Sequence, residues 1–182
     1  MNRAPHSDFI IISGGEKKVG KTYLAVALIQ HFAAQSPVIA LKISPHKHDR
    51  LGNVLTISET AGFRLYQELD VHEKNSGRFL KAGAKASFFL ETEDGFLQEA
   101  MEVFLKKCNF GNLPVVCESG ALGTIIKPGV LIFITYPGTI LSDNKESVRK
   151  LADIVLPARQ FSSLSVADNI QLVGNRWIKR YL

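Results

Sequence analysis

Cysteine is scarce in this chain, since only Cys108 and Cys117 occur among its 182 residues. Two thiols give no disulfide framework, and such low cysteine usage suits a reducing compartment. No apolar run approaches the roughly 20 residues that a membrane-spanning helix needs, and the polar N-terminus has no apolar signal region. Internal repeats, low-complexity tracts and linker-like stretches are also missing. We therefore expect a cytoplasmic protein with no membrane partner, folded as a single domain over residues 1–182.

A concentrated block of positive charge is missing as well. The net charge is +5 and the pI is about 9.2, but the lysines are spread along the chain. This distribution does not indicate a nucleic-acid partner, and no groove-reading motif is present. It is compatible with binding small anionic ligands. Apolar residues make up 46% of the chain, which is enough for a sizeable core.

The most informative motif is GEKKVGKT, from Gly15 to Thr22, which matches the phosphate-binding pattern G-x-x-x-x-G-K-[ST] in full. An apolar run at 9–12 predicts a strand before it, and residues 22–34 predict a helix after it. In that order, backbone N–H groups of the loop and of the helix N-terminus point at one place. Lys21 would reach the β- and γ-phosphates of a nucleoside triphosphate, and Thr22 would supply a hydroxyl to Mg²⁺. The alternative is a tight glycine turn before an ordinary helix. We predict that the nucleotide-binding residues are Gly15, Glu16, Lys17, Lys18, Val19, Gly20, Lys21, Thr22 and Tyr23.

Strand-like and helix-like segments alternate along the chain. This alternation predicts an α/β fold with a mostly parallel central sheet and helices on both faces, of the P-loop NTPase type, with small β-hairpin additions. Asp94 stands where a helix cap is expected. Gly83 stands where a helix end needs left-handed backbone. The segments are strands at 37–43, 86–90, 114–117, 130–136 and 153–156, helices at 75–82, 94–107 and 144–152, and hairpins within 51–69 and 171–181.

Three side chains follow strands at the sheet edge where ligands of such folds bind. Glu118 leaves the strand at 114–117 and enters a glycine-containing loop, so it could hold Mg²⁺ or orient the attacking nucleophile. Asp49, in the loop after the strand at 37–43, could do the same. Lys42 could meet an anionic group of a ligand. We predict Lys21, Glu118 and Asp49 as catalytic residues and Thr22, Asp49 and Glu118 as the metal-binding set.

Other reactive side chains are interpreted as inert. His46 and His48, with Asp49 and in addition Asp70 and His72, could form a transition-metal cluster, but their spacing is not that of a recognised zinc site. Solvated loop histidines are the simpler interpretation. Cys117 lies in an apolar strand, which favours a buried thiol over a nucleophile.

Three further stretches resemble the MobB family of GTP-binding proteins, which act in molybdopterin-guanine dinucleotide biosynthesis. These stretches are ALKISPHKHD at 40–49, Ser76-x-Arg78-x-x-x-Ala82-Gly83-Ala84, and Cys117-Glu118-Ser119-Gly120. The resemblance covers roughly residues 9–120. It implies a P-loop protein that binds GTP with Mg²⁺, hydrolyses it weakly and assists a molybdenum-cofactor nucleotidyltransferase. It also implies an anion contact at Arg78 and a homodimer.

Two other functions remain open. The chain could be an ATP-dependent enzyme that activates a small carboxylate, as dethiobiotin synthetase does, with Lys42, Arg78 or Lys127 binding the substrate anion and residues 119–123 forming a substrate loop. It could also be a nucleotide switch that binds without hydrolysis.

Overall fold

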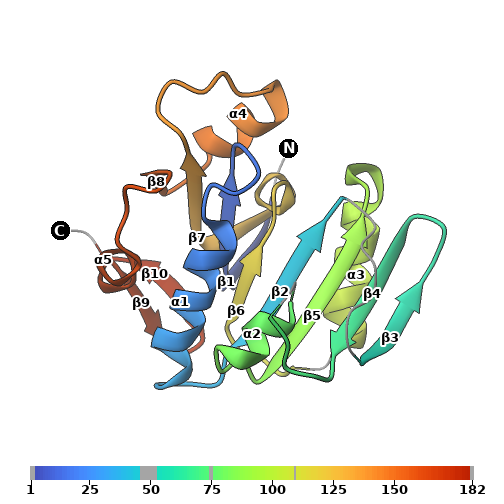
Figure 1. The fold of residues 1–182 in the computed structure, drawn as a ribbon. Coiled ribbons are helices and arrows are strands. Elements are labelled where there is room, and N and C mark those ends of the chain that lie inside the picture. Colours follow the sequence, from blue (N-terminus) through green and yellow to red (C-terminus); the bar gives the residue numbers. More distant parts are fainter. Residues whose placement is uncertain (1–2, 46–52, 74–75, 109, 181–182) are drawn as a thin grey trace.

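The computed structural model describes residues 3–45, 53–73, 76–108 and 110–180. Its centre is an eight-stranded sheet in the order β3-β4-β5-β2-β6-β1-β7-β8 (Figure 1). Neighbouring strands pair in parallel, except that β4 pairs antiparallel with both β3 and β5. The strands are β1 (Ala4–Gly14), β2 (Ile39–Ser44), β3 (Val54–Glu59), β4 (Phe63–Glu68), β5 (Ala86–Thr92), β6 (Val115–Glu118), β7 (Ile126–Thr135) and β8 (Ile154–Pro157). The predicted α/β class and mostly parallel sheet are confirmed.

Both faces of β1 are buried because its side chains alternate between two apolar cores. Ile10 and Ile12 belong to one core, whereas Phe9 and Ile11 belong to the other, and all four are fully buried. In a strand that is covered on both faces, every buried apolar side chain adds hydrophobic stabilisation. This explains its nearly continuous apolar sequence. At about 25 cal/mol per Å² of apolar surface, each such side chain contributes about 1.5–3 kcal/mol of hydrophobic stabilisation.

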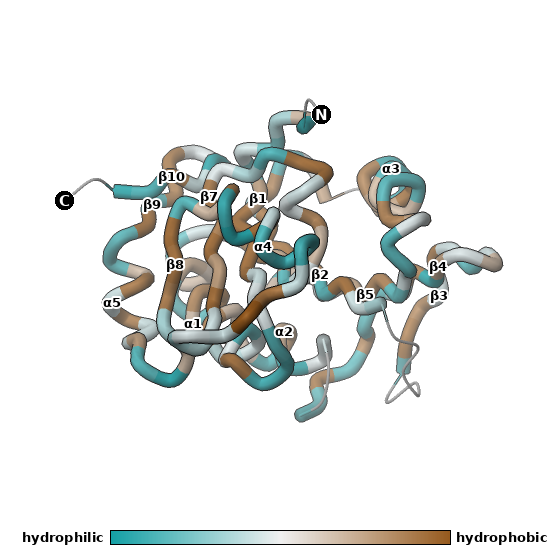
Figure 2. Tube along the Cα trace, turned by 90° about the horizontal axis from the view of Figure 1, so that it is seen from above, coloured by the Kyte–Doolittle hydropathy of each residue, from teal (hydrophilic) through white to brown (hydrophobic). Residues whose placement is uncertain are grey.

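Helices cover the two faces unequally (Figures 1 and 2). The core that contains Ile10 packs against α1 (Lys21–Ala33), α2 (Gly77–Lys81) and α5 (Ser163–Asp168). The opposite core packs against α3 (Leu97–Lys107), and Val148 of α4 (Asp143–Lys150) joins it. In the view from above, α4 lies between the α1 side and the α3 side of the sheet.

Both predicted hairpins are present. The first is β3–β4, which extends the sheet at one edge. The second consists of β9 (Ile170–Val173) and β10 (Arg176–Lys179) and forms a separate two-stranded sheet. Trp177 of β10 is buried and packs edge-on against Phe32 of α1, with ring centroids 4.8 Å apart. A Cβ atom at Gly129 would stand 2.3 Å from the Trp177 carbonyl oxygen, so only glycine allows β7 to approach the hairpin this closely.

Some local expectations need correction. Asp94 does not cap α3, because it lies inside a 3₁₀ turn, Asp94–Phe96, and makes no capping hydrogen bond. The helix α5 was not predicted from the sequence, and β1 and β7 are longer than expected. Gly83 has the left-handed backbone expected of it, with φ +103°.

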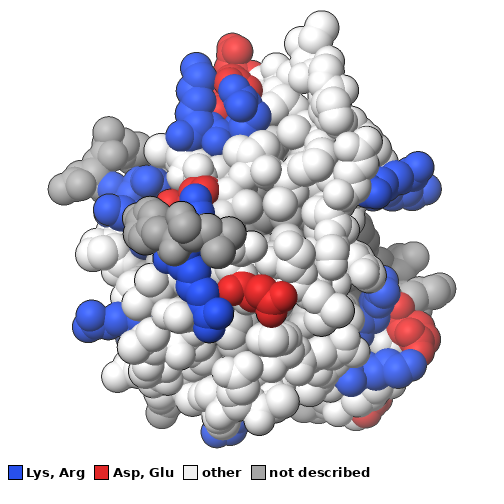
Figure 3. All heavy atoms as spheres, turned by 90° about the vertical axis from the view of Figure 1, so that its left-hand side faces the viewer, with Lys and Arg blue, Asp and Glu red and all other residues white. Residues whose placement is uncertain are grey.

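Positive side chains form separate small groups on the face shown in Figure 3, with wide uncharged areas between them. This agrees with the dispersed lysines of the sequence. Within the described ranges, every helix is too short or too polar to cross a bilayer.

Candidate functional site

The loop between β1 and α1 lies where the central strand of the sheet ends. Its entry is fixed by the Gly15 N–H, which donates to the Ile134 carbonyl of β7 at 2.9 Å. Its exit is Gly20, whose φ of +111° is accessible to glycine at little cost and which precedes the first residue of α1. A Cβ atom at Gly20 would also stand 3.3 Å from the Phe161 ring. The two motif glycines therefore set where the loop leaves the sheet and where the helix starts.

Several backbone donors of this loop are free. In the part of the chain that the structure describes, the N–H groups of Lys17, Lys18 and Gly20 have no hydrogen-bond acceptor. The N-cap of α1 is Gly20, which has no side chain to cap the helix, and the first turn of α1 contains no acidic residue. Unpaired N–H groups at a helix N-terminus carry partial positive charge and favour an anion. The loop thus provides donors for an anionic group.

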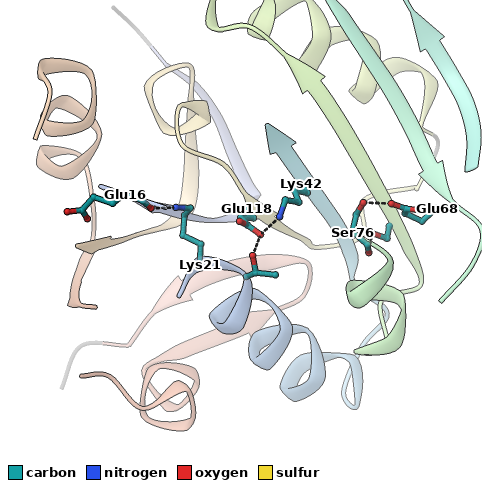
Figure 4. Close-up of polar contacts among 8 residues, drawn as sticks. Glu16, Lys21, Lys42, Glu68, Ser76 and Glu118 are labelled. Carbon is teal, nitrogen blue, oxygen red and sulfur yellow. Dashed lines mark hydrogen bonds and ion pairs between the residues drawn. The ribbon is translucent and has the colours of Figure 1, made fainter. Parts of the chain in front are cut away.

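The side chains of Thr22, Lys42 and Glu118 meet beside this loop (Figure 4). Thr22 Oγ1 donates to Glu118 Oε2 at 2.8 Å, and Lys42 Nζ lies 3.3 Å from the same oxygen. Glu118 is only 7% exposed. Residues 22, 42 and 118 come from α1, β2 and β6, and the parallel order of the strands brings them together. We call these three residues the Glu118 cluster.

The ammonium group of Lys21 turns back over the loop. Its Nζ donates to the Glu16 carbonyl oxygen at 2.7 Å, a bond visible in Figure 4. Burial is the main cause that lowers the pKa of Lys21, and the positive charges of Lys145 and Lys42 add to it. The charge of Glu118 opposes this shift. A partly desolvated cation without a carboxylate in direct contact is well suited to receive an anion.

Other loop residues are held by parts of the chain that carry no motif. Thr139 Oγ1 donates to Glu16 Oε1 at 2.6 Å, which ties the loop to the segment after β7. The exposed Tyr23 has its hydroxyl 3.3 Å from Ser163 Oγ and its ring beside Phe161. Sequence reasoning missed these partners, because single threonines, serines and phenylalanines in loops give no recognisable pattern.

The remaining predicted residues lie elsewhere or outside the described ranges. Asp49, His46 and His48 fall in the segment 46–52, outside the described residues. Arg78 is exposed on α2, which lies beside the C-terminal end of α1 rather than beside the loop (Figure 1). Cys117 is fully buried, as predicted, and burial raises the pKa of its thiol well above the usual value.

Ser76, from the stretch that carries the family resemblance, belongs to a second polar cluster. Ser76 is fully buried and donates to Glu68 Oε1, while His72 Nε2 lies 3.2 Å from Glu68 Oε2. Figure 4 shows this pair apart from the Glu118 cluster. These contacts join the end of β4 to the start of α2, so they hold the fold together at that point.

The residues at the loop fit a magnesium-bound phosphate. Mg²⁺ prefers oxygen ligands and retains much of its water, and the site offers the Thr22 hydroxyl and the Glu118 carboxylate. Because Thr22 already donates its proton to Glu118, the lone pairs of its hydroxyl oxygen are free to face a cation. The free loop N–H groups and Lys21 supply the complementary donors for phosphate oxygens.

Comparison of the chain with protein-family models, curated proteins and solved structures gives no match. The functional interpretation therefore depends on the site itself and on the sequence resemblance.

Proposed function

We propose that this chain is a Mg²⁺-dependent nucleoside-triphosphate-binding protein of the P-loop NTPase type. One observation carries the proposal: Thr22 of the loop donates to Glu118, 96 residues away in the chain, directly beside a loop with unpaired N–H groups. A glycine turn before an ordinary helix would not require a threonine, a buried carboxylate and a lysine to meet at its mouth. The contact supports the interpretation of the loop as a phosphate site.

Each side chain has a distinct task in this proposal. The loop N–H groups would hold phosphate oxygens, and the Lys21 ammonium would exchange the Glu16 carbonyl for a phosphate oxygen. Thr22 and Glu118 would hold Mg²⁺, which neutralises charge on the β- and γ-phosphates when bound. Lys42 would balance the charge of the Glu118 carboxylate and fix its direction. In this proposal Lys42 therefore pairs with the Glu118 carboxylate and does not contact a ligand.

The guanine preference and the biological role rest on the sequence resemblance. On that basis we propose a GTP-binding protein with weak hydrolysis that assists the nucleotidyltransferase of molybdopterin-guanine dinucleotide synthesis. Its location in the cytoplasm and its action as a homodimer are part of the same proposal.

One observation favours the ATP-dependent, carboxylate-activating alternative. Ser119, Gly120 and Ala121, which were interpreted as part of a substrate loop, line a cavity beside the site. Such a cavity would give a second small substrate a place beside a bound nucleotide. Turnover that requires a second small molecule would distinguish this alternative from the GTP-binding role.

Titration calorimetry with GTP and ATP, each with and without Mg²⁺, tests the proposal. We expect Mg²⁺-dependent binding of GTP in preference to ATP. Lys21→Ala should weaken it roughly tenfold to a hundredfold, because a charge-assisted hydrogen bond contributes about 1.5–3 kcal/mol. Lys106→Ala is the matched control, since Lys106 is an exposed lysine on α3.

The outcomes are distinct. Equal nucleotide affinity in folded Lys21→Ala and Lys106→Ala proteins would contradict the phosphate site. A preference for ATP would support the carboxylate-activating alternative. Binding without release of inorganic phosphate would point to the switch that binds without hydrolysis.

A further inference from the structure

A cavity of about 530 Å³ opens beside the Glu118 cluster, on the α3 side of the sheet. Its floor is apolar and includes the buried side chains of Ile43, Leu97 and Val148. Ser119 and Gly120, which directly follow Glu118, form part of its wall. This size and this mixture of an apolar floor with a few polar groups are typical of small-molecule sites.

Two unpaired charges of opposite sign line the cavity. Lys145, in the first turn of α4, has no carboxylate within ion-pair distance in the part of the chain that the structure describes. Asp94, on the 3₁₀ turn before α3, likewise has no cationic partner among the described side chains. The two come from different elements, so a positive group from α4 and a negative group from the turn before α3 both line the cavity.

The position of Lys145 links the cavity to the phosphate loop. Its charge is near enough to Lys21 to lower the pKa of that residue. Ser119, which lines the same cavity, directly follows Glu118 in the chain. A second ligand in the cavity would therefore lie beside the Glu118 cluster.

We propose that this cavity binds a second ligand, a small organic monoanion with an aliphatic body. Its anionic group lies at Lys145, with the Ser119 hydroxyl as a neighbouring donor, and its aliphatic part lies on Ile43, Leu97 and Val148. Asp94 repels a second negative charge, so the cavity selects a monoanion over a dianion of the same length. This inference names the ligand class of the cavity that favours the carboxylate-activating alternative, and it does not depend on which nucleotide the loop binds.

The test uses hexanoate as the probe, with hexylamine and adipate as length-matched comparisons. Binding is followed without nucleotide on the full chain by amide chemical shifts in two-dimensional NMR spectra. We expect millimolar hexanoate to shift the amides of Ser119, Gly120 and Lys145, and adipate and hexylamine to shift them less. Lys145→Met should weaken hexanoate binding about fivefold, a modest loss because Lys145 is exposed.

Two variants and one control make the test specific. Asp94→Asn should narrow the difference in affinity between hexanoate and adipate. Lys150→Met, on the same helix but away from the cavity, should leave hexanoate binding unchanged. Lys21→Ala should also still bind hexanoate, so loss of nucleotide binding and loss of cavity binding can be told apart. Absent shifts, shifts elsewhere, or equal responses to hexanoate and hexylamine would overturn the proposal.

Discussion

The ion pair between Lys42 and Glu118 should stabilise the protein before any ligand binds. Lys42 Nζ lies 3.3 Å from Glu118 Oε2, and the two side chains are only 17% and 9% exposed. Replacing Lys42 with methionine keeps most of the side-chain volume but leaves the carboxylate without its cation. Removing one partner of a fully buried pair costs about 3–5 kcal/mol, and a charge-assisted hydrogen bond contributes about 1.5–3 kcal/mol.

We expect Lys42→Met to lower the free energy of unfolding by about 2 kcal/mol. This value lies in the range for a single charge-assisted hydrogen bond, because Thr22 still donates to Glu118 in the variant. Glu118→Gln should cost less, since the amide oxygen can accept from Thr22 and Lys42 retains some access to water. The double variant should lose about 1–2 kcal/mol less than the sum of the two single variants.

Urea unfolding without nucleotide measures these differences, and the exposed pair Glu146–Arg149 provides the control. Glu146→Gln should change stability little, because exposed ion pairs contribute little. The reasoning would be refuted if Lys42→Met were no more destabilising than Glu146→Gln. Strict additivity in the double variant would refute it as well.

Three further predictions concern Thr22, Lys21 and the two cysteines. Thr22→Val should reduce the effect of Mg²⁺ on GTP affinity, whereas Thr22→Ser should keep it. Calorimetry at several Mg²⁺ concentrations measures this effect. The same Mg²⁺ effect in both variants would remove Thr22 from the proposed metal site. Burial lowers the pKa of Lys21 below its usual 10.5, and a bound triphosphate should raise it again, so GTP binding should take up protons at alkaline pH. Calorimetry in buffers of different ionisation enthalpy measures that uptake, which should vanish in Lys21→Ala. Burial raises the pKa of Cys108 to about 12 and that of Cys117 well above its usual value, so iodoacetamide at pH about 8 should modify neither thiol until urea unfolds the chain. Mass spectrometry would detect early modification, which would contradict their burial.

The central sheet was predictable from the sequence because its apolar runs have the length of strands and are flanked by glycine-containing and polar segments. The runs at 9–12 and 130–136 both became buried parallel strands. By contrast, α5 spans only Ser163–Asp168 and buries two side chains, Val166 and Ala167. A helix this short has no measurable periodicity, and Ser162, whose side chain caps it by accepting from the Ser165 N–H, is of a residue type that is also common in turns.

The candidate site was predictable where topology alone decides position. Thr22 follows the loop and Glu118 ends a parallel strand, so the rule for strand ends brought them together. Lys145 and Thr139 could not be found in this way, since their places depend on how the segments after β7 fold back over the sheet. Asp94 shows the same limit, because a 3₁₀ turn and a capped helix can begin with the same residues.

The pairing of β1 also has a consequence for how the chain acquires its fold during synthesis. Its sheet neighbours are β6 and β7, which are made about 100 residues later than Phe9. Until then the apolar segment at 9–12 has no strand to pair with, and the phosphate loop that follows it has no anchor at Ile134. Such long sequence separation slows folding and leaves apolar surface open to aggregation. The proposed nucleotide site is therefore encoded early in the chain but completed late, and a nascent chain that stalls before β6 should be a substrate for chaperones.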